Sequence, residues 1–167
     1  MHSWSRLFGA MTIFWGMTLS LSIAAPESGR VTVAIGEVKV TAPGEDEKAL
    51  APGDKVVVGS TVKTGPASRA VIVMTTRSAI RVGENSEATI ETLDEAAAPQ
   101  KVLIDLKEGS LGALLKPNAE GAMDFRIKTP SGTAAARGTF FSVAVKDGKG
   151  YTQVKEGRVD IIPAEAQ

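Results

Sequence analysis

Apolar and polar residues alternate along most of this chain in short runs, and glycine, proline or aspartate separates one run from the next. Residues 31–35, 79–82 and 88–93 alternate with a period of two, the pattern of strands with one buried and one wetted face. Residues 70–74 (AVIVM) are nearly all apolar, so this strand is expected to be buried on both faces. Residues 147–150 (DGKG) predict a β-hairpin turn of the Asp-Gly type.

Similar runs predict further short strands in the rest of the chain. They cover residues 38–40, 55–58, 61–64, 101–106, 110–115, 125–129, 139–145, 151–154 and 158–162. No amphipathic helix of ordinary length is predicted, because residues 94–99 allow at most one helical turn before Pro99 ends it. Many short strands at spacings of roughly 8–12 residues predict an all-β fold, a single compact β-sandwich or β-solenoid-like domain.

A weak internal repeat accompanies these strands. Residues 36–38, 108–111 and 156–159 each place a glycine directly before an apolar strand, although their spacing is irregular. A recurring turn-then-strand unit is what a β-solenoid or a pseudo-symmetric sandwich would give.

The N-terminal residues 1–24 have the layout of a secretory signal peptide. Residues 7–23 are a mostly apolar run, and residues 22–24 supply the small residues of a cleavage site, so cleavage is expected after Ala24 or Ala25. The alternative is an uncleaved membrane anchor. It is disfavoured because glycine, serine and threonine interrupt a run that falls short of the roughly 20 residues a span needs.

Signal cleavage would leave a β domain over residues 30–163 and a short tail over residues 164–167. It removes Arg6, the one histidine and both tryptophans but no acidic residue, so the net charge moves from zero to −1. A near-neutral charge argues against nucleic acid or an anionic membrane surface as a partner. We expect an exported protein of a Gram-negative bacterium, periplasmic or secreted, with no membrane span after cleavage.

The residue types that are missing restrict the chemistry further. The whole chain has no cysteine, and the mature part would have no histidine, so disulfides, zinc or copper sites with N/S ligands, thiol nucleophiles and imidazole bases are all excluded there. We therefore predict no metal, no cofactor and no enzymatic activity. One alternative is a hydrolase that uses carboxylates alone, drawn from Asp105, Glu108, Glu156 and Asp160, whose separation the sequence does not fix.

The most distinctive segment is residues 129–141, TPSGTAAARGTFF, which is followed by residues 154–159, VKEGRV. Small residues let backbones approach closely, and Phe140 and Phe141, like Phe125, are expected in the core. The order of these motifs resembles the FecR family of periplasmic domains. The resemblance extends over nearly all of the mature chain, through residues 36–40, 50–56, 62–65, 68–72 and 106–111.

The resemblance implies a role in envelope signalling. Members of the iron-signalling type join a cytoplasmic anti-sigma segment and one transmembrane helix to this domain, and relay the loaded state of an outer-membrane transporter to a sigma factor. The expected signal peptide departs from that plan, so the chain resembles a free-standing FecR domain. The prediction is an exported, non-enzymatic interaction or sensing module with envelope proteins as partners. Two hypotheses stay beside it: a carbohydrate- or peptidoglycan-binding domain, and a regulatory subunit of iron-uptake signalling that acts through a separate membrane partner.

Partner recognition is expected at an exposed strand edge that accepts a partner strand. Arg137 either presents its guanidinium to a partner carboxylate or pairs with a neighbouring acidic residue, and its small neighbours favour the second role. The candidate interaction or structural motif comprises Thr129, Pro130, Gly132, Arg137, Gly138, Thr139, Phe140, Glu156 and Gly157.

Overall fold

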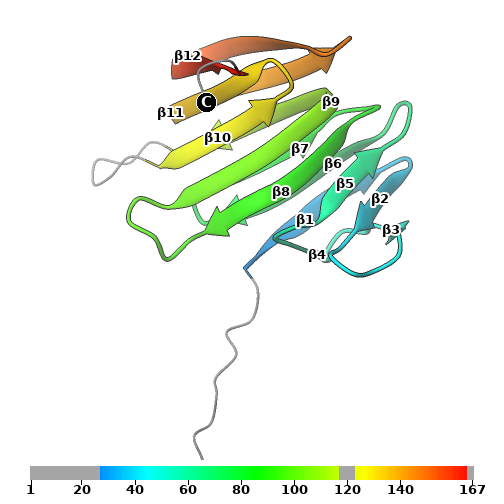
Figure 1. The fold of residues 1–167 in the computed structure, drawn as a ribbon. Coiled ribbons are helices and arrows are strands. Elements are labelled where there is room, and N and C mark those ends of the chain that lie inside the picture. The colour runs from blue at the N-terminus through cyan, green and yellow to red at the C-terminus, as the bar shows by residue number, and fades with distance from the viewer. Residues whose placement is uncertain (1–26, 117–122, 165–167) are drawn as a thin grey trace, which may run out of the picture.

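A computed structural model describes residues 27–116 and 123–164 of the chain, without the side chains of residues 137–139. The predicted signal peptide and most of the predicted tail lie outside these residues. The strands of the described part are β1 (Ser28–Ile35), β2 (Val38–Thr41), β3 (Lys48–Ala49), β4 (Lys55–Val57), β5 (Thr61–Thr64), β6 (Arg69–Thr75), β7 (Ser78–Val82), β8 (Glu87–Asp94), β9 (Lys101–Leu115), β10 (Asp124–Thr129), β11 (Gly132–Lys146) and β12 (Lys149–Pro163). The predicted all-β fold is confirmed (Figure 1).

The strands form one hydrogen-bonded sheet that folds back on itself as two layers, because its longest strands belong to both. Residues 101–108 of β9 pair with β8 and β10, whereas residues 109–115 pair with β7 and β11. Layer I consists of β3, β2, β5, β8, β10 and the adjoining halves of β9, β11 and β12. Layer II consists of β4, β1, β6, β7 and the other halves of the same three strands.

Alternate side chains of both layers point inward and form a single apolar core. Phe125 of β10 and Phe141 of β11 meet there edge to face, with ring centroids 6.1 Å apart and an interplanar angle of 86°. This geometry suits two aromatic quadrupoles, and both rings are buried. The phenylalanine pair therefore joins the two layers at the point where the chain passes between them.

Glycines mark the corners at which the chain changes layer. Gly36 lies between β1 and β2, Gly109 lies within β9 and Gly157 within β12. Their φ angles are 79°, 85° and 91°, which disfavour any residue with a Cβ. These are the glycines of the predicted repeat. At Gly109 and Gly157 the strand bends and continues as β9 and β12, so the prediction of separate strands on either side of these two glycines was wrong.

Two buried serines hold the corners at Gly36 and Gly109. The amide of Glu37, directly after Gly36, donates to Ser68 Oγ at 2.8 Å. The amide of Ser110, directly after Gly109, donates to Ser86 Oγ at 2.9 Å. Each serine supplies a polar partner to a backbone amide at a point where the sheet ladder is interrupted.

The same two serines end two copies of one turn. Residues 65–68 (GPAS) and 83–86 (GENS) share the spacing Gly-x-x-Ser, and their third residues, Ala67 and Asn85, have φ angles of 52° and 47°. In both copies the serine hydroxyl donates to the carbonyl two residues earlier, at 3.0 Å and 2.9 Å. A repeated local turn therefore underlies the corners of the sandwich.

Two predictions of burial were wrong, and both concern the outer face of layer II. On β6 the residues Ala70, Ile72 and Met74 are buried, whereas Val73 between them is 38% exposed because nothing in the described chain covers that face. Phe140 is 41% exposed because successive residues of a strand point to opposite faces and Phe141 occupies the core position. The predicted hairpin turn is confirmed, since Asp147 and Gly148 join paired residues of β11 and β12. β11 begins at Gly132 rather than at Thr139 as predicted.

Candidate functional site

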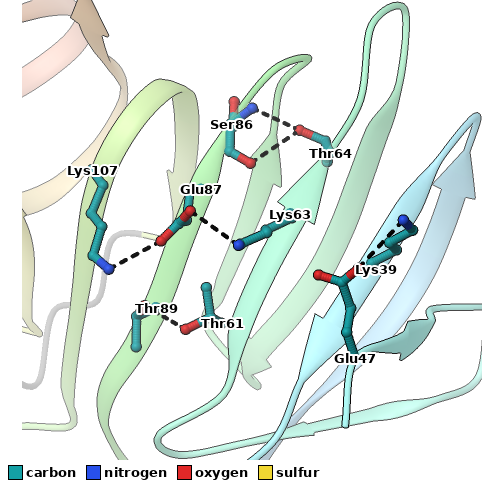
Figure 2. Close-up of polar contacts among 9 residues, drawn as sticks. All are labelled: Lys39, Glu47, Thr61, Lys63, Thr64, Ser86, Glu87, Thr89 and Lys107. Carbon is teal, nitrogen blue, oxygen red and sulfur yellow. Dashed lines mark hydrogen bonds and ion pairs between the residues drawn. The ribbon is translucent and has the colours of Figure 1, made fainter.

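The outer face of layer I is charged, and many of its lysines and glutamates are paired with one another. Glu87 of β8 lies 3.4 Å from Lys63 Nζ on β5 and accepts a hydrogen bond from Lys107 Nζ at 3.0 Å (Figure 2). Lys39 of β2 lies 3.3 Å from a carboxylate oxygen of Glu47 in the same way. The charged groups of such a face are solvated and already have ion-pair partners within the chain.

These pairs shift the titration of their members. The hydrogen bond from Lys107 holds the pKa of Glu87 below its ordinary value, against the opposing effect of partial burial. The same contact raises the pKa of Lys107. Because the folded-state pKa of Glu87 is lowered, its contribution to stability is present above the pKa of an unfolded glutamate and is lost as pH falls through the lowered value.

The outer face of layer II differs, because large apolar side chains lie exposed on it. Leu114 of β9 is 52% exposed and stands in register between Ala79 of β7 and Phe140 of β11. Tyr151 of β12 is 58% exposed and pairs with Ala144 of β11. Ile35 and Val73 belong to the same face through their pairing between β1, β6 and β7. Exposed apolar side chains gathered on one face are typical of an interaction surface.

A groove of about 560 Å³ runs across this face. Gly112 of β9 forms part of its floor, in one row with Arg81 of β7 and Ser142 of β11. A glycine inside a strand leaves room there that a side chain would fill. The groove is lined by Ala67, Ser68, Arg69, Arg81, Gly83, Glu84, Ser110, Gly112, Phe140 and Ser142.

The groove carries two arginines that the described part of the chain leaves without an acidic partner. Arg69 and Arg81 are exposed, and no carboxylate of residues 27–116 or 123–164 lies within ion-pair distance of either. Glu84, the acidic residue of the lining, accepts a hydrogen bond from the Ala67 amide at 2.8 Å. Lys155 Nζ lies 5.3 Å from the centroid of the Phe140 ring. Unpaired guanidinium groups beside apolar side chains suit a partner that presents carboxylates together with apolar residues.

The structure offers little for catalysis in its described part. Among these residues no group of three or more His, Cys, Asp and Glu side chains gathers as metal ligands. Asp105 and Asp160, two of the carboxylates of the hydrolase hypothesis, lie on β9 and β12 of layer I with β10 and β11 between them. Three strand spacings separate the two strands by about 14 Å, wider than a glycosidase pair requires.

The predicted motif is divided between several places. Phe140 lines the groove, whereas Thr129 and Gly132 line a second cavity of about 30 Å³ beside the β10–β11 turn, in which Pro130 lies. Glu156 and Gly157 are exposed at the corner of β12, with Glu156 opposite Phe140 in register. The backbone of Arg137, Gly138 and Thr139 belongs to β11, but their side chains lie outside the described part, so both roles of Arg137 stay open.

The sequence prediction missed Arg69, Arg81 and Leu114. One signal was available, since Gly112 interrupts an apolar strand, and such a glycine indicates close approach of another chain or ligand. The arginines gave no signal of their own, because a charged residue within an alternating strand is typical of any solvated face.

The family described as FecR protein matches residues 60–160, which extend from the corner before β5 into β12 and include every residue that lines the groove. No curated protein and no solved structure gives a significant match. No helix of the described residues has the length and apolar character needed to cross a membrane.

Proposed function

This chain belongs to the FecR family, and from that membership we propose that it is an exported, non-enzymatic interaction module of the bacterial envelope. Its partner is an envelope protein, and the surface that recognises it is the outer face of layer II. Signalling between envelope proteins, including signalling linked to iron uptake, is the setting that the family suggests.

The observation that carries this proposal is the contrast between the two outer faces. On layer I the lysines and glutamates neutralise one another, as Lys63, Glu87 and Lys107 do. On layer II, Arg69 and Arg81 have no acidic partner in the described chain and border exposed apolar side chains such as Leu114. An exposed apolar surface and unpaired guanidinium groups both gain free energy when a complementary partner covers them.

A carbohydrate partner is the second candidate function. Phe140 and Tyr151 are exposed aromatic residues on the same face, as sugar binding requires. However, the Lys155 ammonium lies over the ring of Phe140, and a sugar would have to displace it in order to stack there. The groove chemistry therefore favours an acidic and apolar protein segment over a glycan.

Capture from solubilised envelope tests the proposal. The tagged wild-type chain is compared with the groove variant Arg69→Glu/Arg81→Glu and with a matched control on layer I, Lys63→Glu/Lys128→Glu. Thermal melting verifies that each variant is folded. We expect the groove variant to lose the protein partner recovered by the wild type by about tenfold or more, because two charge contacts become repulsive. The control should retain it.

Equal recovery by the groove variant and the wild type would exclude this face as the recognition surface. Enrichment of glycan instead of protein, with loss in a Tyr151→Ala variant, would move the assignment to the carbohydrate alternative.

A further inference from the structure

The two ends of the folded sheet are protected very differently. At one end the edge strands are β3 and β4, of two and three residues. At the other end the edge strand is β12, which has 15 residues and pairs, among the described strands, with β11 alone. A long edge exposes a row of unpaired backbone N–H and C=O groups, which proteins usually shorten or cover.

The core is also open at β12. Val154 and Ile161 point to the core side of the sheet, since they pair with the buried residues Phe141 and Ala134. They are nevertheless 41% and 56% exposed. Inward-facing apolar residues that remain exposed lose the free energy that burial would supply. This edge therefore has both the hydrogen-bonding groups and the apolar surface to extend the sandwich.

The sequence of β12 allows it to pair with an antiparallel copy of itself. If a second β12 lies antiparallel with the centre between Gly157 and Arg158, Lys155 stands opposite Asp160 and Val154 stands opposite Ile161. Lys155 and Asp160 both point to the outer face, because Lys155 lies over the outward Phe140 and Asp160 pairs with Ala135, between the buried Ala134 and Ala136. At these two pairs the register matches charge with opposite charge on the outer face and apolar with apolar on the core face.

We propose that a second copy of this chain pairs with β12 in that register, so that two sandwiches join edge to edge as a twofold dimer. The corner at Gly157 makes this possible. Residues 149–154 of β12 belong to layer II and residues 158–163 to layer I, so an antiparallel partner places the layer II half of one copy beside the layer I half of the other. Both layers then continue across the dimer, and each pairing occurs twice.

The twofold symmetry also limits the assembly. Each copy uses the long edge at β12, and the other edges of the described sheet, β3 and β4, are too short to extend it further. The interface lies at the end of the sandwich, whereas the groove lies on the outer face of layer II. The two surfaces meet at Lys155, which lies over Phe140 of the groove. Arg69 and Arg81 lie on β6 and β7, away from the β12 edge, and Asp160 lies in the layer I half of β12. Variants of the arginines therefore test partner recognition alone, and variants of Asp160 test the dimer alone.

A charge-exchange cycle tests the dimer and its register. The full chain is exported into the periplasm of a bacterial host and purified, and its mass is measured by light scattering over a concentration series. The wild type should be a dimer at tens of micromolar. Lys155→Glu alone and Asp160→Lys alone each place like charges opposite one another twice, so each should weaken dimerisation by about tenfold or more. The double variant Lys155→Glu/Asp160→Lys should restore it.

A cross-linking measurement is independent of charge. The chain has no native cysteine, so an oxidised mixture of the Val154→Cys and Ile161→Cys variants should give a disulfide-linked dimer that neither variant gives alone. A wild type that remains monomeric at about a millimolar, or a double variant as weak as the single variants, would overturn the proposal.

Discussion

Replacing Phe141 with alanine is expected to lower the free energy of unfolding by about 3–5 kcal/mol. The ring is buried, and it meets Phe125 edge to face at 6.1 Å between centroids. Removing it leaves a cavity at the point where β11 enters layer II, and a sandwich that is tied together there cannot collapse to fill it. Chemical denaturation followed by circular dichroism measures the change.

The neighbouring residue supplies the control. Phe140→Ala removes an identical ring that is 41% exposed on the outer face of layer II and contacts Lys155 at 5.3 Å. This change should cost no more than about 1 kcal/mol. Equal losses for the two variants would show that Phe140 and Phe141 do not point to opposite faces.

Gly109→Ala is the second change with a large expected effect, a loss of about 2–4 kcal/mol. Gly109 has a φ of 85°, and a Cβ built on it would overlap the Ser86 side chain and lie 2.6 Å from the carbonyl oxygen of Asn85. The corner would have to open, and the hydrogen bond from the Ser110 amide to Ser86 Oγ would be lost with it.

Gly112→Ala on the same strand is the matched control for that corner. The φ of Gly112 lies outside the left-handed region that favours glycine. A Cβ at this position would lie 4.0 Å from the Cβ of Arg81, an ordinary van der Waals distance. The control should change stability by less than about 1 kcal/mol. The measurement compares the denaturation midpoints of the two variants. A Gly109→Ala variant as stable as the Gly112→Ala control would mean that the corner tolerates a side chain.

The fold was predictable from the sequence where polar and apolar residues alternate, because the period of two is the geometry of a strand. The wetted face of β6 was not predictable, since Val71 and Val73 are as apolar as the buried Ile72. An apolar run does not show whether both faces are covered. The exposed valine is informative only once its neighbours across the sheet, such as Ala79, are known.

The candidate site was less predictable than the fold, for a topological reason. Arg69, Gly112 and Phe140 lie far apart in sequence and come together only through the pairing of β6, β7, β9 and β11. The corner glycines were visible because a local conformation requires them. The role of Ser68 and Ser86 at these corners was not predicted. Both serines nevertheless end a Gly-x-x-Ser segment, and this repeat is visible in the sequence.

Site-specific photocrosslinking in living cells can show whether the outer face of layer II contacts the envelope partner. A photoreactive amino acid replaces Leu114 on layer II in one strain and Lys63 on layer I in another, and both side chains are exposed. We expect a discrete protein adduct from position 114 and none from position 63. An adduct from position 63 without one from position 114 would contradict this expectation.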